Sequence, residues 1–309
     1  MTDVTRPQLE GSVAVRGGRR LSFAEYGPIH GSALIWMHGT PGARRQIPLE
    51  AREVAEERGI RIIGVDRPGI GSSTPHVYDD VLDWTGDLEI LADTLGVDTM
   101  RVIGLSGGGP YALAAGAALP DRVHGVGVLG GVAPTMGVDA AEGGPIQLAV
   151  ALAPFIKVAR VPLGVVMTQF IRTVRPVAGS FVDLYAHFQP IGDKTLLGRP
   201  EIKAMFVDDL LNGSRFQMTA PLSDLLLFTR PWGFDLADVQ VPVHWWHGDG
   251  DHIVPFRHGV HCSDRLSNVR LTPIDGESHL AGLNVACRVI EGLMDLGPRP
   301  VAEPHAGRA

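Results

Sequence analysis

The stretch GLSGGGP, residues 104–110, surrounds one serine, Ser106, with glycines. The residues before it, TMRVIGL, form a short apolar run rich in β-branched side chains, which predicts a buried strand. The residues after it are rich in alanine and leucine at helical spacing, and Pro110 falls in the first turn, where its missing N–H costs little. The stretch is therefore predicted to be a sharp turn from a strand into a helix, with Ser106 at its tip.

Gly104 and Gly108 flank Ser106 in the pattern G-x-S-x-G. This pattern is typical of a nucleophile elbow, in which a strained backbone presents a serine and a Cβ at either glycine would clash. Phosphate-binding loops do not fit, because no lysine follows the glycines and a serine stands where G-x-G-x-x-G needs its second glycine. Five residues are a weak motif alone, so the prediction depends on finding partners for the serine.

Composition limits the classes of function. The chain has 309 residues, of which 45% are hydrophobic and 20% charged, as in ordinary globular proteins. Lys and Arg number 27 against 34 Asp and Glu, and this acidic balance argues against a general nucleic-acid binder. The two cysteines, Cys262 and Cys287, form no disulfide framework, and no signal peptide is visible at the N-terminus. We therefore expect a cytoplasmic protein.

One apolar segment, residues 145–171, requires testing as a membrane span. Lys157 and Arg160 lie in its middle, and Pro154 and Pro162 are expected to break it. The uninterrupted apolar runs are then much shorter than the roughly 20 residues that a span requires. The segment is predicted to form helices of a buried or lid-like region, without stable membrane insertion.

Predicted strands and helices alternate along most of the chain, and the strands are almost continuously apolar. Such a pattern indicates a parallel sheet covered by helices on both faces. The alternation stops over residues 134–232, where the sequence predicts only helices, as expected for a cap inserted between two strands. The core is therefore predicted at 1–133 and 233–296, and the Pro-rich tail 297–309 is expected to be disordered.

A serine hydroxyl needs a base to accept its proton and an acid to orient that base. In open parallel sheets such groups collect on loops beyond the carboxyl ends of strands. Asp251 follows the predicted strand VPVHWW, with Asp249 as its rival, and His279 follows the predicted strand NVRLTPI. The order serine, aspartate, histidine is that of the α/β-hydrolases.

The chain resembles the α/β-hydrolase superfamily, in the capped branch that includes esterases, epoxide hydrolases, haloalkane dehalogenases and proline iminopeptidases. The resemblance is carried by four motifs in order: HGTPG (38–42), DRPGIGSS (66–73), GLSGGG (104–109) and HGDGDHIVP…GESHL (247–280). It implies an α/β-hydrolase fold, which is a mostly parallel twisted sheet flanked by helices, with an inserted helical cap.

The resemblance also implies roles for individual residues. Asp251 matches the acid and His279 the base, while Asp249 is expected to be a turn residue or a supporting group. Two backbone N–H groups should form an oxyanion hole: that of Gly107, which follows the serine, and that of Thr40, which matches the H-G-x-P-G position.

Other polar residues of the motifs have structural interpretations. His38 is expected to shape its loop, and Asp66 and Arg67 are candidates for an ion pair. His258 and His261 could share a helix face, but no third metal ligand lies near them in the sequence. No metal or organic cofactor is implied.

The sequence thus predicts a serine hydrolase that cleaves a carboxylic ester of a small, lipophilic substrate through an acyl-enzyme. A carbon–carbon bond hydrolase or a haloperoxidase would share the triad. So would an aminopeptidase, although proline iminopeptidases usually carry Trp where this chain has Gly107. Epoxide hydrolases and haloalkane dehalogenases carry aspartate at the position of Ser106. A small-molecule-binding protein without activity is the alternative from another class. The oligomeric state is left open.

Overall fold

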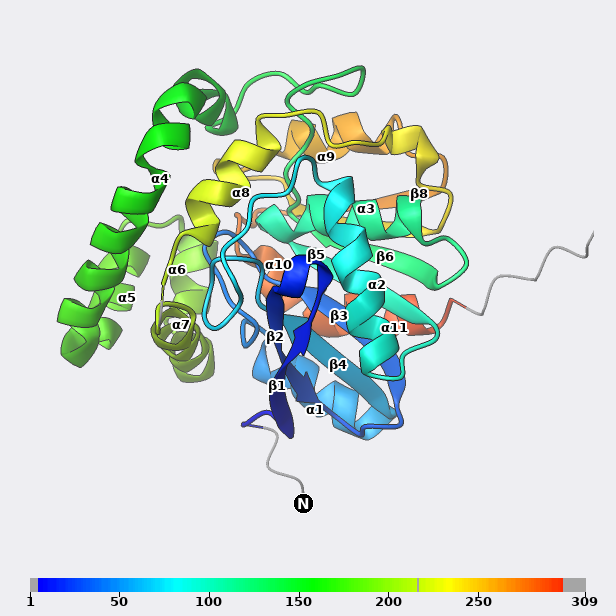
Figure 1. The fold of residues 1–309 in the computed structure, drawn as a ribbon, viewed down its shortest axis with the longest axis horizontal. Helices are drawn as coiled ribbons and strands as arrows, with labels where there is room; N and C mark the ends of the chain where they lie inside the picture. The colour runs from blue at the N-terminus through cyan, green and yellow to red at the C-terminus, as the bar shows by residue number, and fades with distance from the viewer. Residues whose placement is uncertain (1–4, 216, 297–309) are drawn as a thin grey trace, which may run out of the picture.

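The computed structural model describes residues 5–215 and 217–296, and Figure 1 shows a twisted sheet with helices packed around it and further helices at one edge. In this described part, eight strands form one sheet in the order β1-β2-β4-β3-β5-β6-β7-β8. All neighbours from β4 to β8 are parallel, and β2 alone is reversed, since it pairs antiparallel with both β1 and β4. The strands are β1 (Leu9–Ala14), β2 (Arg20–Tyr26), β3 (Ser32–Met37), β4 (Ile60–Val65), β5 (Met100–Leu105), β6 (Val123–Leu129), β7 (Val243–Gly248) and β8 (Val269–Ile274).

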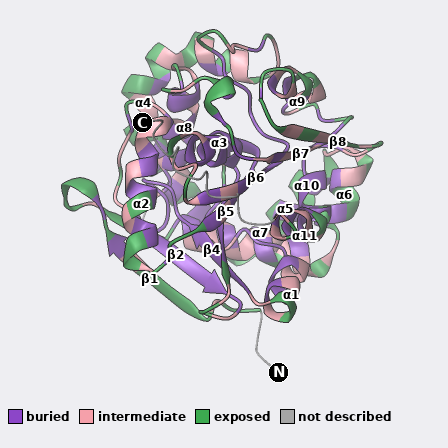
Figure 2. Cartoon of the chain, turned by 90° about the vertical axis from the view of Figure 1, so that its right-hand side faces the viewer, coloured by how far each residue is buried: buried purple, intermediate pink, exposed green. Residues whose placement is uncertain are grey.

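The central strands are buried because helices cover both faces of the sheet. Every residue of β4 is buried, and Figure 2 shows the buried residues gathered along the sheet and the inner sides of the helices. This explains why the sequence of these strands is continuously apolar rather than alternating. The predicted α/β architecture is confirmed. The helices around the sheet are α1 (Leu49–Arg58), α2 (Thr85–Thr94), α3 (Gly109–Ala118), α9 (Phe256–Ser263), α10 (Ala281–Asn284) and α11 (Ala286–Met294).

The segment between β6 and β7 contains further helices and, in its described residues, no strand beyond an isolated bridge at Met218. We call residues 134–232 the cap segment, and its division from the core remains a prediction. The predicted disorder of 297–309 concerns residues outside the described part of the chain. The helices of the cap segment are α4 (Ile146–Val174), α5 (Ala178–His187), α6 (Ile191–Leu197), α7 (Pro200–Gly213) and α8 (Ala220–Phe228).

Helix α4 corrects one expectation from the sequence. Pro154 and Pro162 do not break the segment, which forms one helix of 29 residues. Both prolines lie on its exposed side, so the carbonyl groups that lose a helical N–H partner there can be hydrated. The helix is also mostly exposed rather than buried, because only a narrow stripe along it contacts the rest of the protein.

Candidate active site

Ser106 lies at the end of β5, in the turn that leads into α3. Its φ is 51°, and it is the one residue other than glycine with positive φ in the described chain. A Cβ at Gly104 would approach the carbonyl oxygen of Gly108 to 2.3 Å, and a Cβ at Gly108 would approach that of Met37 to 2.3 Å. Both flanking glycines are therefore sterically required, which is the physical basis of the G-x-S-x-G pattern.

The structure brings the three predicted triad residues into one hydrogen-bonded chain. His279 Nε2 lies 2.9 Å from Ser106 Oγ, and His279 Nδ1 lies 2.7 Å from Asp251 Oδ2. All three residues are buried. Asp249 contacts neither Ser106 nor His279. Its Oδ1 instead accepts a hydrogen bond from the backbone N–H of Gly276 in a surface turn. Asp251 rather than Asp249 therefore holds the position of an orienting acid.

Four groups donate to the carboxylate of Asp251 or contact it. Its Oδ1 accepts the backbone N–H groups of Ile253 and Val254, each at 2.9 Å, and its Oδ2 lies near both His279 and His247. Burial raises the pKa of this carboxyl, but the contacts with His247, His279 and Val254 outweigh burial and hold the pKa well below its ordinary value. Asp251 is therefore ionised at neutral pH and favours the Nδ1–H tautomer of His279.

His247 is a residue of the site that the sequence reasoning missed. It is buried at the end of β7, and its Nδ1 accepts a hydrogen bond from Trp245 Nε1 at 3.2 Å. Its Nε2 therefore carries the proton, which points to Val254 O at 2.7 Å and Asp251 Oδ2 at 3.3 Å. The ring therefore fixes both the acid and the loop that follows it. Its place four residues before Asp251 was the only signal in the sequence.

The two predicted oxyanion-hole residues are also adjacent. An added Cβ at Gly107 would lie 2.3 Å from Thr40 Oγ1, and one at Gly39 would lie 3.7 Å from Ser106 Cβ. The loop after β3 thus packs directly against the turn that carries Ser106. His38 shapes this loop as expected: its Nδ1 donates to Gly39 O at 2.7 Å. Burial and the nearby Arg67 lower the pKa of His38 well below its usual value, so its ring is neutral.

Arg67 does not pair with Asp66, contrary to the expectation from the sequence. Asp66 pairs with Arg44, whereas Arg67 pairs with Asp224 of α8, with 2.8 Å between Nη2 and Oδ2. The reason is the direction of the two side chains, since neighbouring residues in an extended segment point to opposite sides. Arg67 also donates to the carbonyl oxygens of His38 and Gly39, so it braces the loop that carries Thr40.

Asp224 collects donors from three separate parts of the fold. Its Oδ2 accepts the hydroxyl of Thr40 at 2.8 Å and the Nε of Arg67 at 3.0 Å, and its Oδ1 accepts the hydroxyl of Tyr111 at 2.7 Å. All four side chains are buried or nearly so. A carboxylate of the cap segment thus fixes the side chain of the candidate oxyanion-hole residue.

Two more aspartates of the cap segment make comparable contacts. Asp209 of α7 accepts the backbone N–H of Ala43 at 2.9 Å, and Asp193 of α6 accepts that of Leu280 at 2.9 Å. The first contact holds the loop of Thr40 and the second holds the residue after His279. We call Asp193, Asp209 and Asp224 the anchor aspartates. Each comes from a different helix, and together they connect the cap segment to both loops of the site.

The histidines considered as metal ligands bind loop carbonyls instead. His258 Nε2 lies 3.1 Å from Gly143 O, and His261 Nε2 lies 2.9 Å from Asp139 O. Within the described residues, no group of three or more His, Cys, Asp or Glu side chains is arranged to hold a metal ion. These histidines therefore fasten the start of the cap segment to α9.

The chain resembles known enzymes in part of its sequence and in its fold. The chain is 35% identical over 111 residues to a proline iminopeptidase from Xanthomonas citri, and the match spans 35% of each chain, so it covers about a third of that relative. It superposes on an esterase from Rhodococcus with a TM-score of 0.66 at 22% identity, covering 93% of this chain and 99% of the other. A bromoperoxidase from Bacillus anthracis gives a TM-score of 0.63 at 20% identity, with 93% and 99% covered.

The structural similarities establish the fold, and three different kinds of enzyme appear among these proteins. The family model described as alpha/beta hydrolase fold matches residues 32–284, which include β3 to β8 and every candidate residue of the site. The chain therefore belongs to the α/β-hydrolase family.

Proposed function

We propose that the protein is a serine hydrolase that cleaves a carboxylic ester of a small, lipophilic substrate. The observation that carries the proposal is the continuous hydrogen-bonded chain from Ser106 through His279 to Asp251, with the serine on a strained turn. A serine hydroxyl acquires a nucleophilic role when a neutral imidazole accepts its proton and a carboxylate holds that imidazole in the correct tautomer.

The proposed reaction has two halves. Ser106 Oγ attacks the ester carbonyl carbon while its proton passes to His279 Nε2, and the carbonyl oxygen becomes an oxyanion. The backbone N–H groups of Thr40 and Gly107 stabilise that oxyanion. Collapse of the tetrahedral intermediate breaks the C–O bond, and His279 returns the proton to the departing alcohol. Water then attacks the acyl-enzyme by the same path and releases the acid and free Ser106.

The electrostatics of the site support this assignment of roles. The carboxylate of Asp251 has a lowered pKa and remains charged when His279 becomes an imidazolium. The resulting ion pair is buried, so the carboxylate stabilises the cation with little screening by water. The oxyanion-hole donors stand on loops fixed by the anchor aspartates, which limits the reorganisation needed when charge develops.

An aminopeptidase is the second candidate, and the similarity to the Xanthomonas proline iminopeptidase favours it. The small residue Gly107 directly after the serine distinguishes this chain from the Trp that such enzymes usually carry. A carbon–carbon bond hydrolase and a non-catalytic binding protein remain formal alternatives. We also infer a cytoplasmic location, a small-molecule substrate and no nucleic-acid partner, from the composition alone.

The experiment is a panel of p-nitrophenyl esters of increasing acyl length, matched thioesters and aminoacyl amides such as a prolyl amide, each assayed with Ser106→Ala as the blank. We expect the esters to give the highest kcat/KM. Faster turnover of prolyl amides would replace the ester assignment by the aminopeptidase. Equal turnover by Ser106→Ala on every substrate would remove the serine mechanism.

A further inference from the structure

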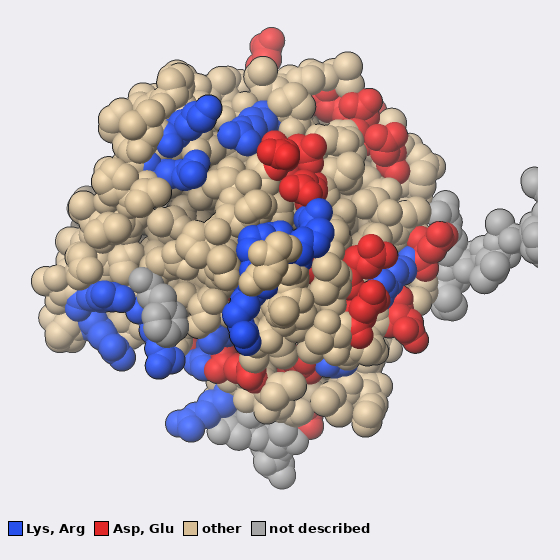
Figure 3. Space-filling model, in the orientation of Figure 1, with Lys and Arg blue, Asp and Glu red and all other residues tan. Residues whose placement is uncertain are grey.

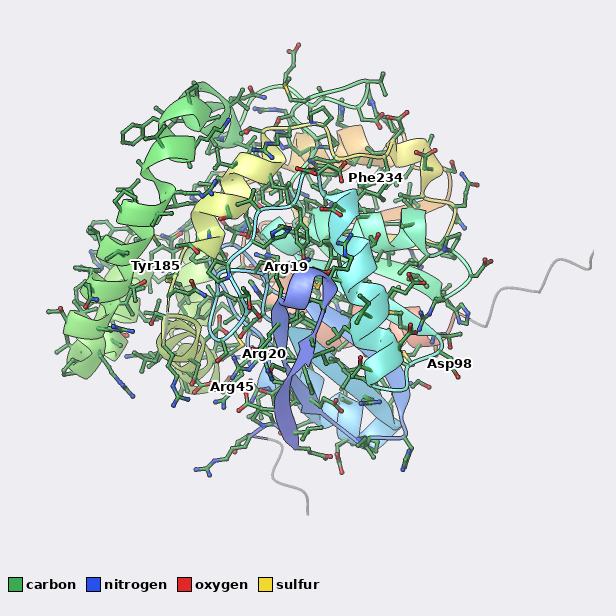
Figure 4. The ribbon with its side chains drawn as sticks, in the orientation of Figure 1. Arg19, Arg20, Arg45, Asp98, Tyr185 and Phe234 are labelled. Atoms are coloured by element: carbon green, nitrogen blue, oxygen red, sulfur yellow. The ribbon has the colours of Figure 1, made fainter. Side chains whose placement is uncertain are left out.

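The outward side of α4 and α5 is the most apolar exposed surface in the described chain. Figure 1 places these helices at the left edge of the molecule, and Figure 4 shows Tyr185 of α5 on that edge. The segment Ile146–His187 has a mean hydropathy of 1.7 in its most apolar window, yet only 11% of that window is buried. We call this surface the outer cap face, and its main side chains are 54–81% exposed: Leu148, Phe155, Val158, Val166, Phe170 and Phe188.

Helix α4 is apolar on two opposite sides. Its inner side carries the buried residues Ala149, Ile156, Gly164 and Ile171, which recur with helical periodicity. Gly164 packs closely on α8, since an added Cβ would lie 2.5 Å from Thr219 Cγ2. The remaining apolar side chains face away from the protein. A helix fixed along its whole inner side cannot leave the protein to cross a bilayer, but its outer side is free to lie on one.

The charged residues of α4 all have one sign, and the one acidic residue of α5, Asp183, is paired with Lys203. Lys157, Arg160 and Arg172 belong to α4 and Arg175 follows it, whereas no Asp or Glu occurs anywhere in α4. The whole protein carries a formal net charge of −7, so this region is a basic island on an acidic molecule. In Figure 3 the left edge is mostly uncharged, and the charged side chains visible beside it are Lys and Arg.

We propose that the outer cap face binds the surface of an anionic phospholipid bilayer, with α4 and α5 lying in the interfacial plane. Exposed Phe, Leu and Val side chains would enter the region between headgroups and acyl chains, and the exposed cations Lys157 and Arg175 would contact lipid phosphates. Arg160 and Arg172 instead line a cavity between α4 and α8. This combination of a long apolar stripe and basic flanks is characteristic of interfacial helices. The binding is peripheral and agrees with the predicted absence of stable insertion.

A second copy of the chain is a poorer occupant of the same face. Two copies paired through α4 would bring cationic helices together, and α4 supplies no acidic side chain to compensate. Like charges facing one another in an interface oppose association. An anionic lipid surface offers both an apolar layer and the complementary charge.

The binding has a consequence that rests on the proposed function. The cap segment that would touch the bilayer also carries Asp224, which bonds Thr40 beside Ser106. Esters dissolved in the membrane would therefore meet the same cap segment that contacts the loop of Thr40. The binding itself does not depend on hydrolysis, so it is measurable in Ser106→Ala.

The experiment is flotation of the purified full-length protein with vesicles of phosphatidylcholine mixed with phosphatidylglycerol, and with vesicles of phosphatidylcholine alone. The wild type and Ser106→Ala should float with the mixed vesicles. The double variant Phe155→Ser/Phe170→Ser should lose this binding. Lys157→Ala and Arg175→Ala should each weaken it by about fivefold, the factor that corresponds to about 1 kcal/mol per cation near an anionic surface.

Matched controls are Ile29→Ser and Val260→Ser, which remove exposed apolar side chains elsewhere on the protein and should float like the wild type. Circular dichroism and thermal unfolding verify that the variants are folded. Failure of the wild type to bind either vesicle would overturn the proposal. A dimer in analytical ultracentrifugation that Phe155→Ser/Phe170→Ser converts to a monomer, without vesicle binding by the wild type, would assign the face to a second copy instead. If the wild type binds vesicles but hydrolyses no ester, only the proposed function is refuted.

Discussion

Replacing Asp224 by Asn tests whether the cap segment contributes to catalysis through the loop that carries Thr40. The carboxylate pairs with Arg67 in a nearly dry environment, since their side chains are 4% and 2% exposed. Removing one partner of such a buried pair costs about 3–5 kcal/mol, because the other charge stays buried without its counterion. A domain whose stability lies above the lower end of the typical range of about 5–15 kcal/mol remains folded after this loss.

The effect on activity should exceed what the lost stability explains. The Thr40 hydroxyl is held by Asp224, and Arg67 holds the carbonyl oxygens of His38 and Gly39 in the same loop. A displacement of about 1 Å of a stabilising group can cost about 100-fold in rate. We therefore expect kcat of Asp224→Asn to fall by about 100-fold on p-nitrophenyl esters while KM changes little, because the oxyanion exists only in the transition state.

The chain provides a matched control in the pair of Arg61 with Glu25. This pair is equally buried, with side chains 7% and 3% exposed, but it lies between β4 and β2, on elements that carry none of the site residues. Glu25→Gln should lose a similar free energy of unfolding in urea and keep the wild-type kcat. The reasoning is refuted if Asp224→Asn retains wild-type kcat, or if both variants lose kcat to the same extent.

Four further outcomes are expected. Asp251→Asn should lower kcat by about 10⁴-fold in steady-state assays, because the amide favours the wrong tautomer of His279. The kcat of Asp249→Asn should stay within a few-fold of the wild-type value. The reverse ranking of the two variants would exchange the roles of the two aspartates. Gly108→Ala should unfold at a lower temperature or fail to fold, since its Cβ meets Met37 O at 2.3 Å, and a stable, active variant in calorimetry would contradict the elbow geometry. His247→Phe should lower kcat in steady-state assays, because it removes a group that contacts the carboxylate of Asp251 and the loop that follows it. An unchanged kcat would assign His247 a packing role only. Burial raises the pKa of Asp209 far above its unfolded value of 3.8, so the wild type loses folding stability as the pH rises above 3.8. Asp209→Asn should therefore be more stable than the wild type at neutral pH, and this difference in stability should vanish in acid. Urea unfolding that shows the same difference in stability at every pH would contradict the prediction.

Ser106, Asp251 and His279 could be proposed from the sequence because the pattern around each of them is local. Each follows a strand that is recognisable from its apolar run, and the ends of parallel strands converge at one edge of the sheet. The glycines beside Ser106 are detectable for the same reason, since the steric requirement lies within a few residues. The structure brings together all five residues that the sequence proposed for the site.

The anchor aspartates could not be found in this way. Thr40 and Asp224 are 184 positions apart, and nothing local to either residue indicates their contact. Asp224 stands in an ordinary-looking apolar helix, where an acidic residue is normally taken to face solvent. Arg67 was therefore assigned to its neighbour Asp66. The continuous helix α4 was missed because local rules treat proline as a breaker, whereas an exposed side tolerates the unpaired carbonyls.

The most direct test of the central claim is to treat the protein with a fluorophosphonate probe and identify the modified peptide by mass spectrometry. The account predicts one adduct, on Ser106, formed at a rate that falls sharply in His279→Ala because the base is gone. No labelling is expected in Ser106→Ala. Labelling that persists undiminished in Ser106→Ala, or no labelling of the folded wild type, would contradict the account of Ser106 as an activated nucleophile.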